Sequence, residues 1–286
     1  CTRVLIVPAY PQYSGTTTAS VFDAVYSWAA QVRLIPELRF INRYHDQAGY
    51  IEALKQRVQQ HWLAHGRPDK LLMSFHGVPQ RTLEMGDPYH CECHKTGRLL
   101  AEALGLKKEE YVVTFQSRFG KAKWLEPYTE PTLKALAGSG TKRVDVICPG
   151  FTSDCLETLE EISQEARETF LHAGGQEFHY IPCLNDSGAW IHALAGLCEQ
   201  HLAGWPTQQP QDAAAGEATR QRAIEEERRR AEEKRKAEAE AAAAAPAPAA
   251  APPHPRPAAP LTGWHGTQRP ARCVNDPTRG RRKERT

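Results

Sequence analysis

Six short apolar runs alternate with six longer amphipathic segments over the first 205 residues of this chain. The short runs are rich in β-branched and aromatic residues, which predicts strands, and the longer segments show helical periodicity. Strict alternation of this kind is typical of parallel sheets with helices on both faces. We expect strands over residues 3–9, 38–43, 70–75, 111–115, 143–148 and 177–183, and helices over 17–32, 48–65, 94–104, 129–137, 155–172 and 187–202.

The loop Gly66-Arg67-Pro68-Asp69 separates the first two strand–helix units from the other four. Gly and Pro interrupt regular structure, so this loop is the expected domain joint. The sequence therefore predicts two α/β lobes, residues 1–66 and 67–205. Because the chain opens with Cys1 and passes directly into an apolar strand, we expect it to be a fragment whose first lobe is incomplete.

Residues 206–286 consist mainly of Ala, Glu, Arg, Lys, Pro and Gln, a composition that does not build a core. Residues 217–245 place opposite charges at i, i+4, which predicts a charged helix. An extended Ala/Pro linker to Pro260 follows, and then a basic end from Leu261 with seven Arg or Lys and two acidic residues. We favour solvated disorder or an out-of-frame extension for this end over contact with RNA or anionic lipid.

Composition excludes several classes of protein. A formal net charge of +2 is too small for the whole surface to attract nucleic acid or membranes, so we expect no specific nucleic-acid partner and at most peripheral membrane contact. The sequence contains no apolar run of roughly 18 residues and no basic-then-apolar leader, which favours a cytoplasmic protein. Eight cysteines scattered over such a chain are expected to be mostly reduced and structural.

Two motifs carry the expected chemistry, and each follows an apolar strand. His76 lies in the run Ser74-Phe75-His76-Gly77-Val78-Pro79, and Asp154, Glu157 and Glu161 lie in the acidic run that starts at Phe151. Ligands of open α/β sheets bind at the carboxyl ends of the strands, so an imidazole would face carboxylates across one crevice, an arrangement suited to proton abstraction or brief cation binding. The alternatives are a loop-capping histidine and acids that favour a helix N-terminus.

Other loops are candidates for contacts with a ligand. The segment Phe115 to Leu125 mixes cations with aromatic rings and would suit a flat anionic ligand, although a polar loop anchored by one Trp is the simpler interpretation. The loop Pro8 to Thr17 has phenols and hydroxyls but no phosphate-binding glycine pattern. The run His90-Cys91-Glu92-Cys93-His94 lacks a second ligand pair at metal spacing, so packing is favoured over a stable metal site.

Five motifs in this order resemble the ferrochelatase family, over about residues 3–203. They are the PQYS-TT loop from Pro11, S-x-H-x-x-P from Ser74, Gly86-Asp87-Pro88-Tyr89, Gln116-Ser117-Arg118 with Trp124, and P-x-F-T-S-D-x-x-E-T-L-E-E from Pro149. The variant with Cys155 is similar to the proteobacterial branch. The resemblance implies a lyase that inserts Fe²⁺ into protoporphyrin IX in haem biosynthesis. It also implies two Rossmann-like, chelatase-type lobes with a porphyrin cleft between them.

The resemblance also implies roles for individual residues. His76 and Glu157 correspond to the catalytic pair, and a π-helical turn is implied in the acidic helix. Fe²⁺ would be a substrate rather than a resident cofactor, held by His76, Glu157, Glu161 and Asp154. The implied porphyrin contacts are Tyr10, Gln12, Tyr13, Ser74, Gln116, Ser117, Arg118, Trp124 and Ser153. His76 as proton acceptor and His76 as metal donor both remain open at this point.

The departures from the family lead to two further expectations. Family members carry a longer N-terminal part, so we expect this chain to be weakly active or inactive. The tail offers only Cys273, from which we expect no [2Fe-2S] cluster. A non-catalytic tetrapyrrole or metal binding module is the alternative function, and a scaffold role of the tail is a weaker one.

Overall fold

The structure, a computed structural model, describes residues 1–207 and 213–244. The chain divides into two compact units, Cys1–Gln209 and Pro210–Thr286. The first unit contains six strands: β1 (Arg3–Ile6), β2 (Glu37–Phe40), β3 (Lys70–His76), β4 (Tyr111–Gln116), β5 (Arg143–Ile147) and β6 (Glu177–Ile181). All pair in parallel, as the two-stranded sheet β1-β2 and the four-stranded sheet β4-β3-β5-β6. The predicted α/β class with parallel sheets is confirmed, whereas the lobe boundaries stay a prediction.

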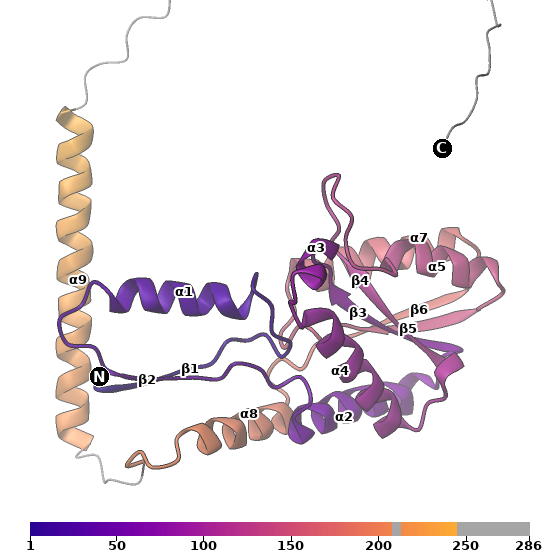
Figure 1. Cartoon of the computed structure of the whole chain (residues 1–286), viewed down its shortest axis with the longest axis horizontal. Helices are drawn as coiled ribbons and strands as arrows, with labels where there is room; N and C mark the ends of the chain where they lie inside the picture. The colour runs from indigo at the N-terminus through magenta and orange to yellow at the C-terminus, as the bar shows by residue number, and fades with distance from the viewer. Residues whose placement is uncertain (208–212, 245–286) are drawn as a thin grey trace, which may run out of the picture. The chain divides into compact units, whose positions relative to one another are not determined.

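Helices cover both faces of the four-stranded sheet (Figure 1). Residues of β3 alternate between the faces, with Leu71, Met73 and Phe75 in one core cluster and Leu72 in the other, as the two-residue period of a strand requires. One face carries α2 (Ala48–His65), α4 (Tyr89–Leu104) and α8 (Gly188–His201), and the other carries α5 (Thr129–Gly138), the π-helix η2 (Glu161–Ala166) and α7 (Arg167–His172). The remaining short elements are α3 (Gln80–Glu84), the 3₁₀ turn η1 (Lys108–Glu110) and α6 (Leu156–Leu159).

Two helix predictions need correction. Helix α4 begins at Tyr89, five residues before the expected start, with Pro88 as its N-cap and with the Asp87 carboxylate accepting from the Tyr89 backbone N–H at 3.0 Å just before the first turn. The single helix expected over 155–172 is divided into α6, η2 and α7. The π-helical turn implied by the family resemblance is thereby confirmed, and such turns are frequent at functional sites.

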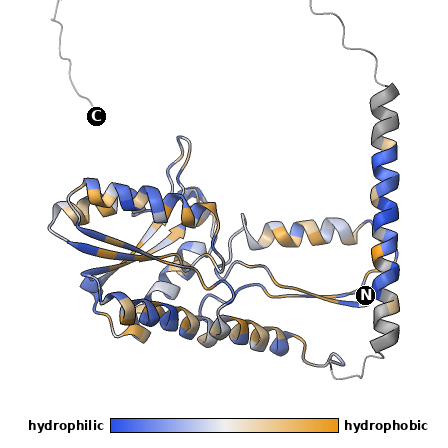
Figure 2. Cartoon of the chain, turned by 180° about the vertical axis from the view of Figure 1, so that it is seen from behind, coloured by the Kyte–Doolittle hydropathy of each residue, from blue (hydrophilic) through white to orange (hydrophobic). Residues whose placement is uncertain are grey.

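The small sheet is covered by α1 (Thr18–Ala29), which packs its Phe22 ring against Phe40 of β2 at a centroid distance of 4.6 Å. Strands β1 and β2 stay only partly buried. The hydropathy colouring in Figure 2 shows that both contain apolar residues. The loop that leaves β1 leads to the carboxyl edge of the larger sheet. This loop therefore brings the PQYS-TT residues to the site described below.

In the second unit the structure describes one helix, α9 (Ala213–Ala244), so the predicted charged helix begins four residues earlier than expected. Its middle is strongly hydrophilic (Figure 2), and Arg230 donates to Glu226 one turn away at 2.5 Å. The predicted Ala/Pro linker, the basic end and Cys273 lie outside the described residues. Among the described helices, none combines the length and apolar character needed to cross a membrane.

Candidate active site

A pocket of about 570 Å³ lies where the loop after β1 meets the loops that follow β3 and β5. These loops leave the carboxyl ends of parallel strands, the edge at which open α/β sheets bind ligands. The pocket brings together seven residues predicted from the sequence: Tyr10, Gln12, His76, Trp124, Ser153, Asp154 and Glu157. His76 and the acidic run therefore share one cavity.

His76 is the last residue of β3, and its ring is partly buried. The ring Nδ1 lies 2.7 Å from the backbone carbonyl of Gly77. A carbonyl oxygen only accepts, so Nδ1 carries the proton, and Nε2 of the neutral ring is left with a free lone pair. The Tyr89 hydroxyl donates to the His76 backbone carbonyl at 3.0 Å, which fixes the strand end. The imidazole is thus held in the tautomer that can accept a proton or bind a metal through Nε2.

Glu157 lies in the first turn of α6, exposed at the pocket wall. A hydrogen bond from the Cys155 thiol is the largest of the influences that hold the pKa of Glu157 below its usual value, and the nearby His76 adds a smaller effect in the same direction. The carboxylate is therefore ionised at neutral pH. An anionic oxygen ligand and a basic ring nitrogen face the same cavity.

Asp154 also lines the pocket, but its oxygens are already occupied. One oxygen accepts from the Tyr180 hydroxyl at 2.5 Å and the Cys183 N–H at 3.1 Å, and the other accepts from the Asn185 amide at 2.6 Å. Burial raises the pKa of Asp154, yet these hydrogen bonds outweigh it and leave the pKa below its usual value. The carboxylate anchors the loop after β5 to the loop after β6.

Glu161 lies outside this pocket, so the single acidic face expected for Asp154, Glu157 and Glu161 is not what the structure contains. Its carboxylate accepts from the Ser117 backbone N–H and hydroxyl, both at 2.5 Å. Ser117 has a φ of 62°, a left-handed conformation that these two bonds stabilise. The π-helix starts at Glu161, so the straight-helix spacing on which the expectation rested does not apply.

Ser74 and Gln116 lie behind the pocket wall rather than in it. The Ser74 hydroxyl donates to Gln116 Oε1 at 2.7 Å, and Gln116 Nε2 donates to the Glu157 backbone carbonyl at 2.6 Å. Both side chains are buried, and His76 pairs with Gln116 in the sheet register. This chain of hydrogen bonds connects strand β3, which ends at His76, to the start of the acidic helix.

Trp124 is a buried wall of the pocket. A Cβ at Gly77 would lie 3.1 Å from the Trp124 ring and 2.8 Å from the Gln116 carbonyl, so glycine lets the loop after β3 approach this wall. Trp124 Nε1 is buried and has no hydrogen-bond partner within the part of the chain that the structure describes.

The remaining predicted contacts lie around this core. Gln12 is buried and donates to the Thr96 hydroxyl at 3.0 Å. Tyr13 and Arg118 lie outside the pocket, where the Arg43 guanidinium is 5.4 Å from the Tyr13 ring and the Arg118 guanidinium is 4.7 Å from the Tyr128 ring.

Two aromatic residues that the sequence analysis left unassigned also line the pocket. They are Tyr89, which fixes the His76 backbone, and Phe151, whose ring centroid is 6.3 Å from that of His76. Both lie inside motifs that carried the family resemblance, so their motif positions were the available signal. Periodicity alone does not distinguish such aromatics from core residues.

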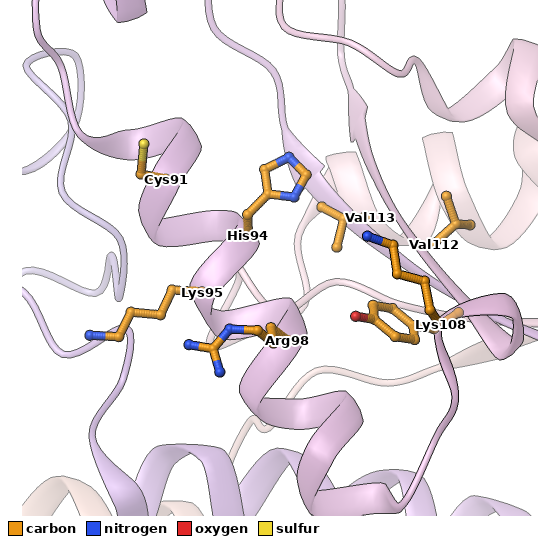
Figure 3. A pocket seen from close by; sticks show the side chains of 8 residues that line it. Cys91, His94, Lys95, Arg98, Lys108, Val112 and Val113 are labelled. Atoms are coloured by element: carbon orange, nitrogen blue, oxygen red, sulfur yellow. The ribbon is translucent and has the colours of Figure 1, made fainter.

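The run His90 to His94 lies in the first turns of α4. His94 and Cys91 line a shallow pocket between α4 and β4 together with Lys95, Arg98 and Lys108 (Figure 3). The His90 and His94 rings pack near Phe115, with centroids 5.8 and 6.0 Å from it. Packing was the favoured interpretation of this run, and these contacts agree with it.

Comparisons with known proteins complete the description of this site. Among solved structures, the chain is similar to the sirohydrochlorin chelatase SirB from Bacillus subtilis subspecies spizizenii in complex with cobalt, with a TM-score of 0.46 and 11% identity over 70% of each chain. Among curated proteins, the ferrochelatases of Polaromonas sp. and Methylibium petroleiphilum are 70% and 66% identical to it over 78% of this chain.

The chain spans 61% of the length of both of these relatives. The ferrochelatase of Janthinobacterium sp. is 68% identical over 72% of this chain and 56% of its own length. A family model described as Ferrochelatase matches residues 1–202. The chain therefore belongs to the ferrochelatase family.

Proposed function

We propose that this pocket inserts Fe²⁺ into protoporphyrin IX to form protohaem. One observation carries the proposal: the free Nε2 of His76 and the ionised carboxylate of Glu157 line the same cavity. Membership of the ferrochelatase family supports it. The substrates are a porphyrin and a hydrated ferrous ion, and the reaction is a porphyrin metallation.

The chemistry explains why these two groups suit the task. Two pyrrole protons must leave the macrocycle, which needs a base that is neutral at the working pH. The ferrous ion must exchange its waters and then leave the protein, which needs nitrogen or oxygen ligands that bind it weakly. Imidazole and carboxylate meet both needs, whereas thiolates would hold the metal too tightly.

We assign proton acceptance to His76 and a proton-carrying or ion-guiding role to Glu157. The Gly77 carbonyl fixes the His76 tautomer, so Nε2 is ready to take a pyrrole proton. Asp154 and Glu161 use their carboxylates in protein hydrogen bonds, so the proposal restricts metal contact to His76 and Glu157. Delivery of the metal by His76 is the alternative assignment.

The walls of the pocket suit a flat aromatic macrocycle. Trp124, Phe151 and Tyr10 supply aromatic rings to the pocket lining. Bending the porphyrin turns its nitrogen lone pairs outward, and packing against these rings would supply binding energy for that distortion. The unpartnered Trp124 N–H would suit an acceptor on the macrocycle, such as a carboxylate.

The test is a metallation assay with the chain as given and, because it spans 61% of the length of its relatives, with a form extended to their full length. Protoporphyrin and Zn²⁺ or Fe²⁺ are followed by absorbance, in which metallation collapses the free-porphyrin bands. His76→Ala should lower the rate by about 10²–10⁴-fold, as expected for loss of a general base. Glu157→Gln should lower it too, whereas Glu160→Gln, one turn on and outside the pocket, should leave it unchanged.

Two outcomes would contradict the proposal. One is a metallation rate that His76→Ala and Glu157→Gln leave unaltered. The other is a full-length form that shifts the porphyrin spectrum without band collapse, which would identify a binding module instead. The absence of a resident cofactor or cluster, the cytoplasmic location and the limit of peripheral membrane contact all stay predictions.

A further inference from the structure

Three histidines gather at the opposite edge of the four-stranded sheet from the pocket. His61 and His65 lie one turn apart near the end of α2, and His179 lies in β6. One ring nitrogen from each forms a group whose members all lie within 4.8 Å of one another. In the residues that the structure describes, no other cluster of His, Cys, Asp or Glu meets this metal-binding criterion.

The fold places these side chains together. His179 is the register partner of Asp145 in β5, so both side chains lie on one face of the sheet. Helix α2 packs on that face and is fixed there by Trp62, whose Nε1 donates to Asp145 at 3.0 Å. His61 and His65 flank Trp62 in sequence. The spacing i, i+4 brings their rings onto one side of the helix, with centroids 4.4 Å apart.

Each ring has a nitrogen available for a metal. His65 Nδ1 lies 3.2 Å from the His61 backbone carbonyl, and His179 Nε2 lies 2.7 Å from the Glu177 carboxylate. Each of these nitrogens therefore carries the ring proton, which leaves a lone pair on His65 Nε2 and on His179 Nδ1. His61 Nε2 is buried and has no hydrogen-bond partner among residues 1–207 and 213–244. His65 and His179 thereby match metal-binding histidines, whose second ring nitrogen donates to a carbonyl or carboxylate.

The electrostatic surroundings favour a divalent cation. Asp145 is fully buried, with one oxygen 3.6 Å from His61 Nε2, and Glu177 lies beside His179. Arg143 is the cation that pairs with these two carboxylates.

We propose that His61, His65 and His179 form a second metal site, for a divalent transition ion such as Zn²⁺ that prefers imidazole ligands. Glu177 orients His179, and water completes the coordination. Nitrogen ligands of a tetrahedral zinc ion lie roughly 3.4 Å apart, given Zn–N bonds of about 2.0–2.1 Å, so nitrogens that lie within 4.8 Å of one another need to approach by at most about 1.4 Å on binding. A bound ion would fasten the end of α2 to β6, far along the sheet from His76.

The test titrates the full chain with Co²⁺ alone, whose visible absorption reports imidazole coordination. The parent chain and His76→Ala should both develop the band. His65→Ala and His179→Ala should weaken the affinity by more than tenfold, and Glu177→Gln by about 10–100-fold. His192→Ala, which removes an exposed histidine from α8, is the matched control and should bind like the parent.

A second measurement separates binding from loss of structure. Zn²⁺ should raise the unfolding temperature of the parent chain and of His192→Ala but not that of His65→Ala, because only the native state brings the three rings together. His65 is exposed, so its replacement leaves the core intact. Superimposable Co²⁺ isotherms for the parent, His65→Ala and His179→Ala would overturn the proposal.

Discussion

The side-chain amide of Gln116 donates a hydrogen bond to the backbone carbonyl of Glu157, with 2.6 Å between nitrogen and oxygen. Gln116 ends β4, and Glu157 lies in the first turn of α6, so the bond joins the sheet to the helix that carries the acidic half of the site. The other end of the same amide accepts from Ser74 in β3. One buried side chain thus sets the position of Glu157 relative to the strand that ends at His76.

Gln116→Met should therefore destabilise the protein although it keeps the side chain's size. The Glu157 carbonyl would lose this donor, and the Ser74 hydroxyl would keep only Thr129, whose hydroxyl lies 2.9 Å away. A buried group left without a partner costs about 1–3 kcal/mol in the free energy of unfolding. Urea denaturation measures this loss. Gln164→Met, at an exposed position of the π-helix, is the control and should change the free energy by less than about 0.5 kcal/mol. Equal stabilities of the two variants would show that the buried amide contributes nothing.

Glu161 should contribute to stability rather than to metal binding. Its two short hydrogen bonds from Ser117 are charge-assisted, and losing them in Glu161→Ala should lower the free energy of unfolding by about 1–3 kcal/mol. The neighbouring Glu160 is exposed, so Glu160→Ala should cost less than about 0.5 kcal/mol. Urea denaturation of both variants decides the matter, and a Glu161→Ala protein as stable as the parent would refute the prediction.

The Cys155 thiol should set the acid titration of Glu157. Its hydrogen bond is the main reason why the pKa of Glu157 is below the usual value, so Cys155→Ala should raise that pKa. The carboxylate would then lose its charge at a higher pH as the solution is acidified. Carbon-detected NMR of the Glu157 carboxyl group measures the midpoint directly. The control is Cys198→Ala, on the distant helix α8, which should leave the midpoint where it is in the parent. An unchanged midpoint in Cys155→Ala would show that the thiol does not lower the pKa of Glu157.

Two helical glycines should respond in opposite directions to alanine. A Cβ at Gly97 in α4 would lie 2.6 Å from the Val113 side chain, so Gly97→Ala should lower the free energy of unfolding by about 1–3 kcal/mol through overpacking. Nothing lies within 4 Å of a Cβ at Gly196 in α8, so Gly196→Ala should raise the free energy of unfolding by about 0.5–1 kcal/mol. Thermal or urea unfolding checks both. A stabilised Gly97→Ala variant would show that α4 can move away from β4.

Much of the fold could be predicted because local sequence carries its signal. The strand that ends at His76 is a run of buried apolar residues followed by Gly77 and Pro79, and both the run and its end are readable from residue types. Helix starts were less certain. Helix α4 begins five residues before its expected start, after a Pro88 N-cap that makes no side-chain capping hydrogen bond, so the residue types there gave no capping signal.

The composition and order of residues by themselves determined that this chain forms parallel sheets and that His76 and the acidic run lie at one sheet edge, because strand direction and strand ends follow from local pattern. Only the tertiary structure decided that Glu157 faces the pocket while Glu161 binds Ser117. Only it brought His179 to His61 and His65. Hydrogen-bond partners and histidine neighbours from distant segments depend on how the layers pack, and the spacing of residues along one helix or strand does not encode that packing.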